Sequence, residues 1–396
     1  KYIEIDEENK KDIFGGGIRN EEAYEALGNK GYPFLGGGCP TVGIVGLILG
    51  GGWGYSSRYF GLAADSLIEA TMINYEGDKI IINKDLNSDL FWALKGIGGG
   101  NVGVITSVTL ALKDKVDKGT LIRINYKNLS KDKAIEVIEI LQKLYKDLDV
   151  KLNIKTAMYN SEKDGIGIKF TGLFYGNKEE CEKILKPILD LGSYIKNKDL
   201  DLDYLSILEC NNIIQFSHPD YESYKSTGRF LYEDLKEEEI EKLYEVLKNK
   251  AEGSVYNAIT LYGMGGNIKN VKIEDSAFYY RDSKFILGFQ SVWEDDIYAE
   301  TNKEWIINNF NFIKSITKGS FVNFPLKELE NYEEEYYGEN LERIKEVKIR
   351  YDENIYNNIK DEIPGIETQE EEKEDIKVTR VKITNEEGPN TIGKPV

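Results

Sequence analysis

The sequence feature that most constrains this chain is a glycine-rich run at residues 36–54. Nine of its nineteen residues are glycine, and Cys39 stands beside Pro40 within it. Glycine permits backbone angles that are closed to other residues, and it lets another group approach the main chain closely. The run therefore predicts a backbone folded around a large flat or anionic ligand, with a cysteine placed to touch that ligand or to bond to it.

Three interpretations of this run compete. A phosphate-binding P-loop requires Gly-x-x-x-x-Gly-Lys-Ser/Thr, and no lysine follows these glycines. A dinucleotide-binding fingerprint requires a preceding strand, a following helix and an acidic residue about 20 positions further on. The spacing from Gly46 to Gly50 does not match that fingerprint. A glycine-rich packing loop without a ligand stays open as the third interpretation.

The bulk composition excludes several classes of protein. The net charge is −18 over 396 residues, whereas binding of nucleic acid requires a basic face. Three cysteines, Cys39, Cys181 and Cys210, make no disulfide framework. The single histidine, His218, nearly excludes a His-based metal site, so we expect no metal ion. No apolar stretch of about 18 residues occurs, and we expect no membrane span.

Residues 1–112 form the first predicted unit, which is rich in glycine and has short helices and strands. A helix is expected over residues 20–27 with Asn20 as its N-cap, because two glutamates follow that asparagine. Residues 76–78, Glu-Gly-Asp, are typical of a hairpin turn. The other expected elements are strands at 2–5, 67–75, 79–83 and 102–112 and one or two helical turns at 88–94.

Residues 113–325 form the second predicted unit, in which longer amphipathic helices alternate with strands. The expected helices are 131–145, 178–191 with a kink at Pro187, 237–248 and 301–316. The expected strands are 150–158, 166–175 and two within 276–293. This order lacks the rhythm of parallel βαβ units. The chain is therefore predicted to be α+β, with an antiparallel sheet covered by helices on one side.

The C-terminal part is predicted to form two further regions. Residues 326–364 contain a helical segment at 332–347. Residues 365–396 carry no clear fold signal, and we interpret them as a tail.

Several motifs in a fixed order resemble one enzyme family. The N-terminal ones are Gly-Gly-Gly-Cys-Pro-Thr-Val-Gly at 36–43, Gly-Gly-Gly-Trp-Gly at 50–54, and the segments 59–65, 87–96 and 98–106. They are similar to the FAD-binding domain of the vanillyl-alcohol oxidase / p-cresol methylhydroxylase (PCMH) superfamily, and more narrowly to berberine-bridge-enzyme-like oxidases. Residues 321–323 and 336–344 resemble the berberine-like C-terminal segment of that family.

The resemblance covers roughly residues 1–364 and implies a domain plan. Residues 1–112 correspond to the C-terminal part of a PCMH-type FAD-binding domain, and residues 113–325 to a substrate-binding α+β domain. Residues 326–364 correspond to the berberine-like segment, which returns to the FAD domain.

The resemblance implies an FAD cofactor held by the glycine-rich run. In the family a cysteine at the position of Cys39 forms a thioether to C6 of the flavin, and a thiolate is the reactive form of cysteine. A free thiol beside a noncovalent flavin is the alternative. For Asp65, a capping carboxylate that anchors the loop is the alternative to a cofactor contact. The other implied cofactor-binding residues are Pro40, Thr41, Val42, Gly43, Gly50, Gly51, Gly52, Gly54, Gly103, Val104 and Asn354.

The resemblance also implies an oxidoreductase that acts on an alcohol, a sugar or an aromatic small molecule. In the family a base removes a proton, a hydride passes to flavin N5 and oxygen reoxidises the flavin. Tyr336 and Tyr337 match a tyrosine pair near the family's active site, where one tyrosinate acts as the base. An unperturbed tyrosine has a pKa of about 10 and needs strong activation for that role. We expect one of the two to pack in the core.

The sequence departs from the family pattern in ways that bear on function. Gly288 stands where plant members often carry Gln or Glu, with Gln290 two residues further on, and Tyr280 and Arg281 replace a common Pro-His-Arg. No segment matches the preceding family subdomain, whose Gly-Gly-His makes a second flavin bond. We therefore expect a fragment, or a chain that has lost this part. Two alternatives to an oxidase follow: a flavin-less binding module, and an FAD dehydrogenase that uses another electron acceptor.

Overall fold

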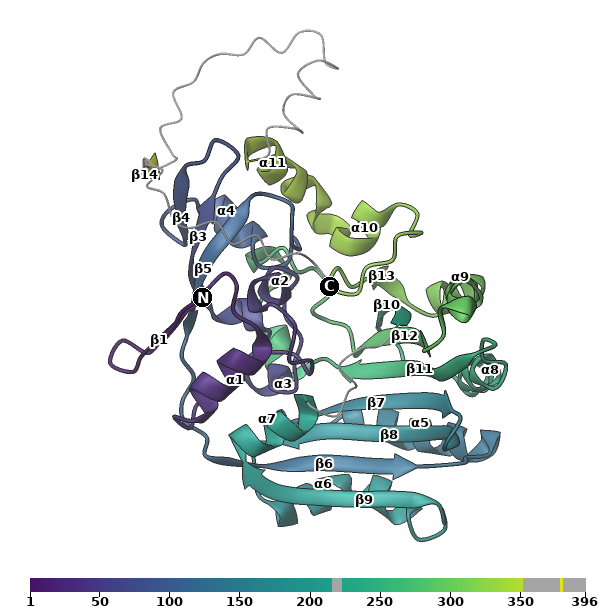
Figure 1. The fold of residues 1–396 in the computed structure, drawn as a ribbon. Helices are drawn as coiled ribbons and strands as arrows, with labels where there is room; N and C mark the ends of the chain where they lie inside the picture. The colour runs from purple at the N-terminus through teal and green to yellow at the C-terminus, as the bar shows by residue number, and fades with distance from the viewer. Residues whose placement is uncertain (216–222, 352–377, 380–396) are drawn as a thin grey trace.

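Two antiparallel sheets organise the residues that the computed structural model describes, which are 1–215, 223–351 and 378–379 (Figure 1). One sheet has six strands and the other has eight. Helices pack on both, so the described chain is mixed helix and antiparallel sheet. This arrangement confirms the predicted α+β class.

The smaller sheet is formed mainly by the N-terminal part of the chain. In β4 the side chains of Ile80 and Ile82 are buried and that of Lys79 is exposed, as the alternation of a pleated strand requires. The strand order is β1-β2-β5-β3-β4-β14. The strands are β1 (Ile3–Asp6), β2 (Lys11–Gly15), β3 (Leu67–Ile73), β4 (Lys79–Asn83), β5 (Val104–Ala111) and β14 (Val378–Thr379).

Five helices place apolar side chains in the core of the smaller sheet. Two of them follow the larger sheet in the chain and return to this core, where Ile344 and Val347 are buried beside Ile44 and Ile48. The helices are α1 (Asn20–Gly28), α2 (Ile44–Leu49), α4 (Ser88–Ala93), α10 (Tyr332–Tyr337) and α11 (Leu341–Tyr351).

The larger sheet is formed by the middle of the chain and has the strand order β13-β10-β12-β11-β7-β8-β6-β9. Five of these strands, β6, β9, β10, β11 and β13, were not predicted from the sequence. In β9 charged and apolar residues alternate; Asp203 pairs with Arg123 of β6, and Asp199 pairs with Lys127, which directly follows β6. The strands are β6 (Lys118–Tyr126), β7 (Leu152–Ser161), β8 (Gly165–Phe174), β9 (Lys198–Ser206), β10 (Ser223–Leu231), β11 (Ser254–Gly263), β12 (Phe285–Trp293) and β13 (Lys318–Ser320).

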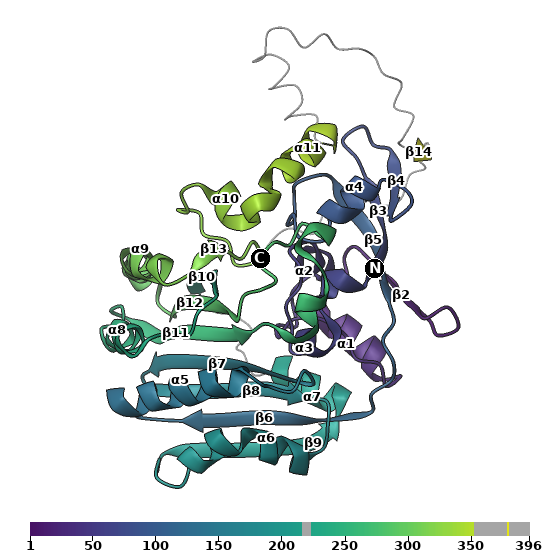
Figure 2. The same cartoon turned by 180° about the vertical axis from the view of Figure 1, so that it is seen from behind.

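The two faces of the larger sheet differ in what covers them. On β7, Ile154 and Met158 point to the face that four helices cover, whereas Lys155 and Tyr159 point to the opposite face, which we call the Lys155 face. Figures 1 and 2 show α5 and α6 on one side of the sheet and α7 on the other. The helices are α5 (Lys131–Tyr145), α6 (Lys178–Leu191), α7 (Ile207–Gln215), α8 (Glu237–Lys248) and α9 (Ala299–Ser315).

Several sequence predictions need correction. Residues 276–293 were expected to contain two strands, but the structure has only β12 there. In the segment before β12, Arg281 bonds to Asp65 and the Phe278 ring packs on Gly51, so this segment does not pair as a strand. The helical segment 332–347 divides at Gly338, whose φ of 53° lies in the left-handed region. By contrast, α5 and α8 begin and end at the predicted residues, and α6 contains Pro187 as expected.

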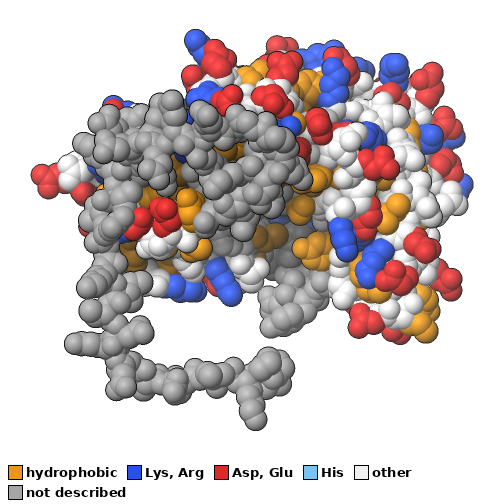
Figure 3. All heavy atoms as spheres, turned by 90° about the horizontal axis from the view of Figure 1, so that it is seen from above, with side chains coloured by type: hydrophobic (Ala, Val, Ile, Leu, Met, Phe, Trp, Pro, Cys, Tyr) orange, Lys and Arg blue, Asp and Glu red, His pale blue; other side chains and the backbone are white. Residues whose placement is uncertain are grey.

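Three general features bear on the partners of this chain. No helix in the described ranges is long and apolar enough to cross a membrane. The same ranges contain no group of three or more His, Cys, Asp or Glu that could hold a metal ion. On the coloured surface seen from above, Lys and Arg side chains are interspersed with Asp and Glu (Figure 3).

Two buried arginines join the glycine-rich part of the chain to the larger sheet. Arg281, just before β12, forms an ion pair with Asp65 at 2.7 Å, and their side chains are 1% and 7% exposed. Arg58, in α3 (Ser57–Phe60), is 4% exposed. Its guanidinium donates hydrogen bonds of 2.6–2.9 Å to the carbonyl oxygens of Leu148, Leu152 and Met264.

Replacing Arg281 by methionine is expected to lower the free energy of unfolding by about 3–5 kcal/mol, because Asp65 would remain as a buried carboxylate without its partner. The midpoint of urea unfolding, followed by tryptophan fluorescence, measures this change. The control is Lys186→Met, which removes an ion pair with Asp190 whose side chains are 70% and 62% exposed. An exposed pair stabilises by less than about 1 kcal/mol. Equal midpoints for the two variants would contradict the prediction.

Candidate functional site

The start of α1 fixes the main chain of residues 39–43. The side-chain amide of Asn20 donates a hydrogen bond of 2.9 Å to the carbonyl oxygen of Cys39, and Asn20 is fully buried. The backbone N–H of Asn20 donates to the carbonyl of Val42, and that of Glu21 to the carbonyl of Pro40. The backbone around Cys39 is therefore held in place, while the Cys39 side chain itself is exposed.

Asn20 is a site residue whose role the sequence analysis missed. It was predicted to be the N-cap of the first helix, but that position belongs to Arg19, and Asn20 lies within α1. Asn followed by two glutamates resembles a cap signal in sequence. The contact to Cys39 spans 19 positions and leaves no local signal.

Two parts of the chain, the residues after Cys39 and the start of β5, have exposed apolar side chains, and the first of them also has bare main chain. A Cβ added at Gly43 or at Gly46 would meet no atom within 4 Å. Val42 is 36% exposed, and Val104, which follows the exposed Gly103 at the start of β5, is 67% exposed. Glycines that face open space and uncovered valines are what an extended flat cofactor requires from the protein. These residues fit FAD.

Four other glycines of the run face the protein interior. The N–H of Gly51 donates to the carbonyl of Ile48, and the N–H of Gly54 donates to Ser57 Oγ at 2.8 Å. Neither group is available to a phosphate oxygen. A Cβ at these positions would meet neighbouring protein atoms at 2.0–2.6 Å, namely Asn323 at Gly50, Phe278 at Gly51, Ala63 at Gly52 and the carbonyl oxygen of Gly36 at Gly54. The bare main chain beside Cys39 is thus that of Gly43 and Gly46, not that of these four glycines.

Asp65 acts as an anchor for the loop. One of its carboxylate oxygens accepts a hydrogen bond of 2.9 Å from the backbone N–H of Leu62, and both oxygens contact the guanidinium of Arg281 at 2.7 and 3.1 Å. Of the two interpretations that the sequence left open for Asp65, these contacts favour the capping carboxylate.

Aromatic rings connect the glycine-rich run to the Lys155 face. The Trp53 ring lies 5.4 Å from that of Tyr55 and 4.9 Å from that of Tyr262, measured between centroids. Trp53 Nε1 donates a hydrogen bond of 2.8 Å to the carbonyl of Gly263. Lys155 Nζ lies 6.0 Å from the centroid of the Tyr262 ring. A Cβ at Gly38, next to Cys39, would lie 3.3 Å from the Tyr55 ring.

Cys39 also interacts electrostatically with these side chains. Burial lowers the pKa of Lys155 to about 8, against an opposing effect of charge on Cys39 and with a further lowering by Lys169. Burial raises the pKa of Tyr55 and of Tyr262, and the charge on Cys39 raises both further. Cys39 therefore lies within electrostatic range of the Lys155 face, and among these three groups Lys155 alone titrates near neutrality.

The two tyrosines predicted as catalytic have different hydrogen bonds. The hydroxyl of Tyr337 is buried and donates to the carbonyl of Ile97 at 2.8 Å, and burial raises its pKa to about 12. The hydroxyl of Tyr336 accepts a hydrogen bond from the N–H of Leu326 at 3.2 Å, and burial raises its pKa above the usual value. Asn354, the remaining predicted cofactor contact, lies outside the described residues.

The departure at Gly288 has a structural explanation. Gly288 lies on β12 beside Thr260 of β11, and a Cβ there would be 2.8 Å from the Tyr262 ring. The Tyr262 side chain thus occupies space that a Gln or Glu at position 288 would need. Gln290 lies on the same face of β12 and is half-buried.

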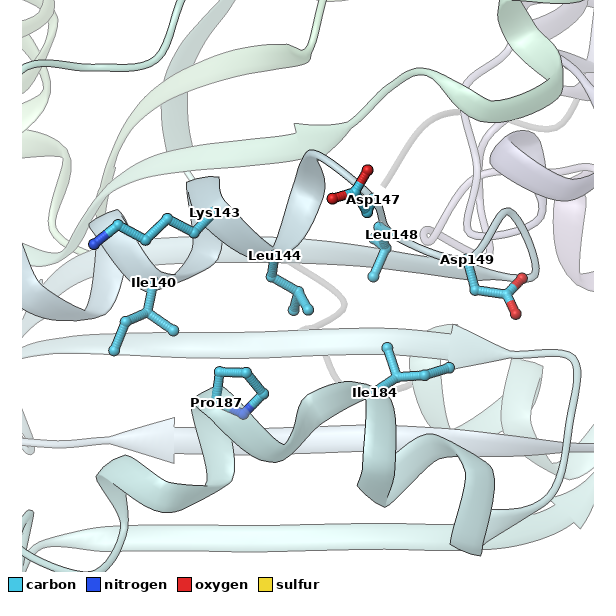
Figure 4. Close-up of a pocket in the computed structure, with 8 residues that line it drawn as sticks. All are labelled: Ile140, Lys143, Leu144, Asp147, Leu148, Asp149, Ile184 and Pro187. Atoms are coloured by element: carbon cyan, nitrogen blue, oxygen red, sulfur yellow. The ribbon is translucent and has the colours of Figure 1, made fainter.

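A separate hollow of about 730 Å³ lies between α5 and α6. Figure 4 shows Leu144 and Ile140 of α5 and Pro187 and Ile184 of α6 around it. This hollow is on the helix-covered side of the larger sheet, whereas Cys39 is coupled to the opposite face. It is therefore no part of the candidate cofactor site.

Comparisons with known proteins identify the family of this chain. The family described as "FAD binding domain" matches residues 1–83, and the family described as "Berberine and berberine like" matches residues 320–359. The uncharacterised FAD-linked oxidoreductase YgaK of Bacillus subtilis (strain 168) is 30% identical over 361 residues, which cover 90% of this chain and 78% of that protein. The carbohydrate oxidase of Microdochium nivale is 28% identical over 342 residues, which cover 80% of this chain and 66% of that protein.

A solved structure shows the same fold. The structure of chitooligosaccharide oxidase superposes with a TM-score of 0.78 at 21% identity, covering 90% of this chain and 78% of that one. The matched families and the full-length relatives together define the class. This chain belongs to the berberine-bridge-enzyme-like family of FAD-linked oxidoreductases; it is an enzyme, and FAD is its cofactor.

Replacing Gly54 by alanine is expected to destabilise the fold by about 1–3 kcal/mol, because the new Cβ would lie 2.0 Å from the carbonyl oxygen of Gly36 and the backbone would have to move. Gly43→Ala is the control. Its φ of −68° and ψ of 126° suit alanine, and open space surrounds it. We expect its free energy of unfolding to change by less than about 0.5 kcal/mol. Thermal unfolding compares the variants, and an unchanged melting temperature for Gly54→Ala would refute the packing role.

Proposed function

We propose that this chain is an FAD-dependent oxidase that removes two hydrogens from a hydroxylated small molecule and passes the electrons to oxygen. The observation that carries the proposal is the exposed Cys39 in an anchored glycine-rich run, electrostatically coupled to an aromatic and polar sheet face. Among alcohols, sugars and aromatic compounds we favour sugars. The names of two relatives, carbohydrate oxidase and chitooligosaccharide oxidase, support that choice.

The side chains of the Lys155 face suit a sugar. Tyr159 and Tyr256 stack with 5.5 Å between ring centroids, and Tyr262 lies on the same face of β11 as Tyr256. Aromatic rings cover the apolar faces of a ligand, while their hydroxyl groups and those of threonines bond to polar groups. Thr171 and Thr260 supply further hydroxyls on this face.

The residues around Cys39 would hold the cofactor in defined ways. FAD supplies the hydride acceptor, and the protein supplies orientation and electrostatics. The bare backbone at Gly43 and Gly46 would lie against the cofactor, and Val42 and Val104 would be covered by it. Pro40, Thr41 and Gly103 adjoin these positions and complete the proposed contact set. We further propose that the Cys39 sulfur carries a thioether to the flavin.

Of the two tyrosines, Tyr336 is the better candidate for the base. Its oxygen accepts a hydrogen bond from Leu326 N–H, and a donor to that oxygen favours the phenolate form. Tyr337 instead donates its proton to the carbonyl of Ile97, which favours the neutral form. A hydrogen bond with Asn101 acts in the opposite direction, but burial still raises the pKa of Tyr337 to about 12. Tyr337 is therefore proposed to position the C-terminal segment against residues 96–100.

The thioether is tested by the mass of the intact protein after denaturation. The expected mass exceeds that of the polypeptide by one FAD less two hydrogen atoms, and Cys39→Ala is expected to lose this increment. Cys181→Ala serves as the control, because Cys181 is buried in the core of the larger sheet. A protein that is yellow when folded but has the bare polypeptide mass would contradict the thioether and leave FAD binding intact.

The oxidase reaction is tested by peroxide release in the presence of cello-oligosaccharides, monosaccharides and aromatic alcohols. We expect peroxide to form in step with product. A flavin that substrates reduce but oxygen does not reoxidise would indicate a dehydrogenase. A colourless protein that takes up no added FAD would indicate a binding module.

Tyr336→Phe is expected to lower kcat by about 10²–10⁴-fold, the usual effect of losing a general base, with little change in melting temperature. Tyr337→Phe is the matched control, since it removes a buried hydrogen bond worth about 1 kcal/mol of stability and leaves kcat within a few-fold. Stopped-flow reduction of the flavin and thermal unfolding give the two readouts. The assignment fails if Tyr337→Phe has the larger kinetic effect.

A further inference from the structure

The outer part of the Lys155 face is neutralised by ion pairs between β6 and β9. Arg123 of β6 lies 2.8 Å from Asp203, measured between Nη2 and Oδ2. Lys127, which directly follows β6, lies 2.7 Å from Asp199, measured between Nζ and Oδ2. Arg123 and Lys127 thus each have a carboxylate partner on β9.

Lys155 and Lys169 lie next to these pairs on the same face and differ from them. Lys155 on β7 faces Thr171 on β8, and Lys169 on β8 faces Ala157 on β7, so the two lysines are diagonal neighbours across this strand pair. Within the described ranges, neither ammonium group has a carboxylate within the 4.0 Å that defines an ion pair. Acidic residues outnumber basic ones by 69 to 51 in this chain, so most lysines are expected to lie near a carboxylate. Two neighbouring lysines without an ion-pair partner are therefore unusual for this composition.

The surroundings of these two lysines disfavour their charged forms. Burial lowers the pKa of both lysines, and the charge on Lys169 lowers that of Lys155 further. At Lys169, Arg123 adds to the lowering of the pKa, and charge on Asp164 opposes it. Like charges directly opposite each other destabilise a sheet, and diagonal neighbours at about 7–8 Å are still within reach of long side chains. An arrangement that costs stability and lies beside a reactive site is a candidate for ligand binding.

A chain of contacts connects Lys155 to the glycine-rich run that carries Cys39. Lys155 is in one cross-strand row with Tyr262, whose ring packs on Trp53 of the glycine-rich run. Charge on Cys39 affects the pKa of Lys155, which places the two within electrostatic range. Lys169 is exposed and Lys155 half-buried, so a ligand on this face can reach both.

We propose that Lys155 and Lys169 form a subsite for an anionic group, a carboxylate or a phosphate ester, carried by the hydroxylated substrate. This inference rests on the proposed function, because it concerns the substrate of the same site. The neighbouring Thr171 and Asn125 supply neutral hydrogen-bonding groups for the rest of the ligand. The preferred substrate is then an acidic or phosphorylated sugar rather than a neutral one.

The test is direct binding to the purified full chain, measured by isothermal titration calorimetry with D-glucuronate, D-glucose 6-phosphate and D-glucose. We expect at least one of the two anionic probes to bind about tenfold or more tightly than glucose, as a pair of partly desolvated charges would give. We call the ratio of an anion's affinity to that of glucose its margin, and the probe with the larger margin identifies the anionic group. Lys155→Gln and Lys169→Gln are each expected to reduce this margin severalfold.

The matched control is Lys127→Gln, which removes a lysine on the same face that already has a carboxylate partner. It is expected to keep the margin. Glucose binding as tightly as both anions, no measurable binding of either anion, or an unchanged margin in both lysine variants would each overturn the subsite. Equal losses in the Lys127 control would do the same, because they would show a general effect of surface charge.

The readout is independent of the oxidase reaction, so the two proposals can fail separately. A yellow enzyme that releases peroxide with neutral sugars and binds anions no more tightly would overturn the subsite and leave the oxidase in place. A colourless protein that binds glucuronate through Lys155 and Lys169 would do the reverse.

Discussion

The close packing at Gly50–Gly54 is the constraint on which the rest of the site depends. At these glycines the run meets Asn323 from the segment between β13 and α10, Phe278 from the segment before β12, and the carbonyl of Gly36 from its own first half. Any side chain there would separate elements that must touch. Because these contacts converge on one short stretch, the positions of the smaller sheet, the larger sheet and the C-terminal helices are set together.

The two halves of the glycine-rich run serve different purposes. Gly43 and Gly46 face open space beside Cys39, whereas Gly50 and Gly54 are buried against protein atoms. Both uses follow from the same property, the absence of a side chain. From the sequence one could predict that other atoms approach the main chain of this run closely. One could not decide which glycines face a cofactor and which face the protein itself.

The parts that could be predicted from the sequence are those with a local signal. The apolar periodicity of α5 and α8 predicted both helices at their observed bounds. The motif around Cys39 predicted the cofactor and the family. β9 also had a local signal, the alternation of charged and apolar residues, which was not used. What could not be predicted depends on distant pairing. Asp65 anchors the loop through Arg281, which lies 216 positions away in the sequence. Spacing along the chain carries no trace of such contacts.

The position of Tyr262 explains why this chain has a glycine at position 288. The ring that would collide with a side chain at 288 packs on Trp53, and Trp53 in turn bonds to the backbone of β11. Gly288 and Tyr262 thus depend on each other. Where plant members often have a polar side chain at position 288, this chain has the ring of Tyr262 in the same space. A chain that has made this exchange cannot draw a carboxylate or amide from position 288. The proposed proton acceptor therefore comes from another element, and of the two tyrosines of α10 we propose Tyr336, whose oxygen accepts a hydrogen bond from Leu326 N–H.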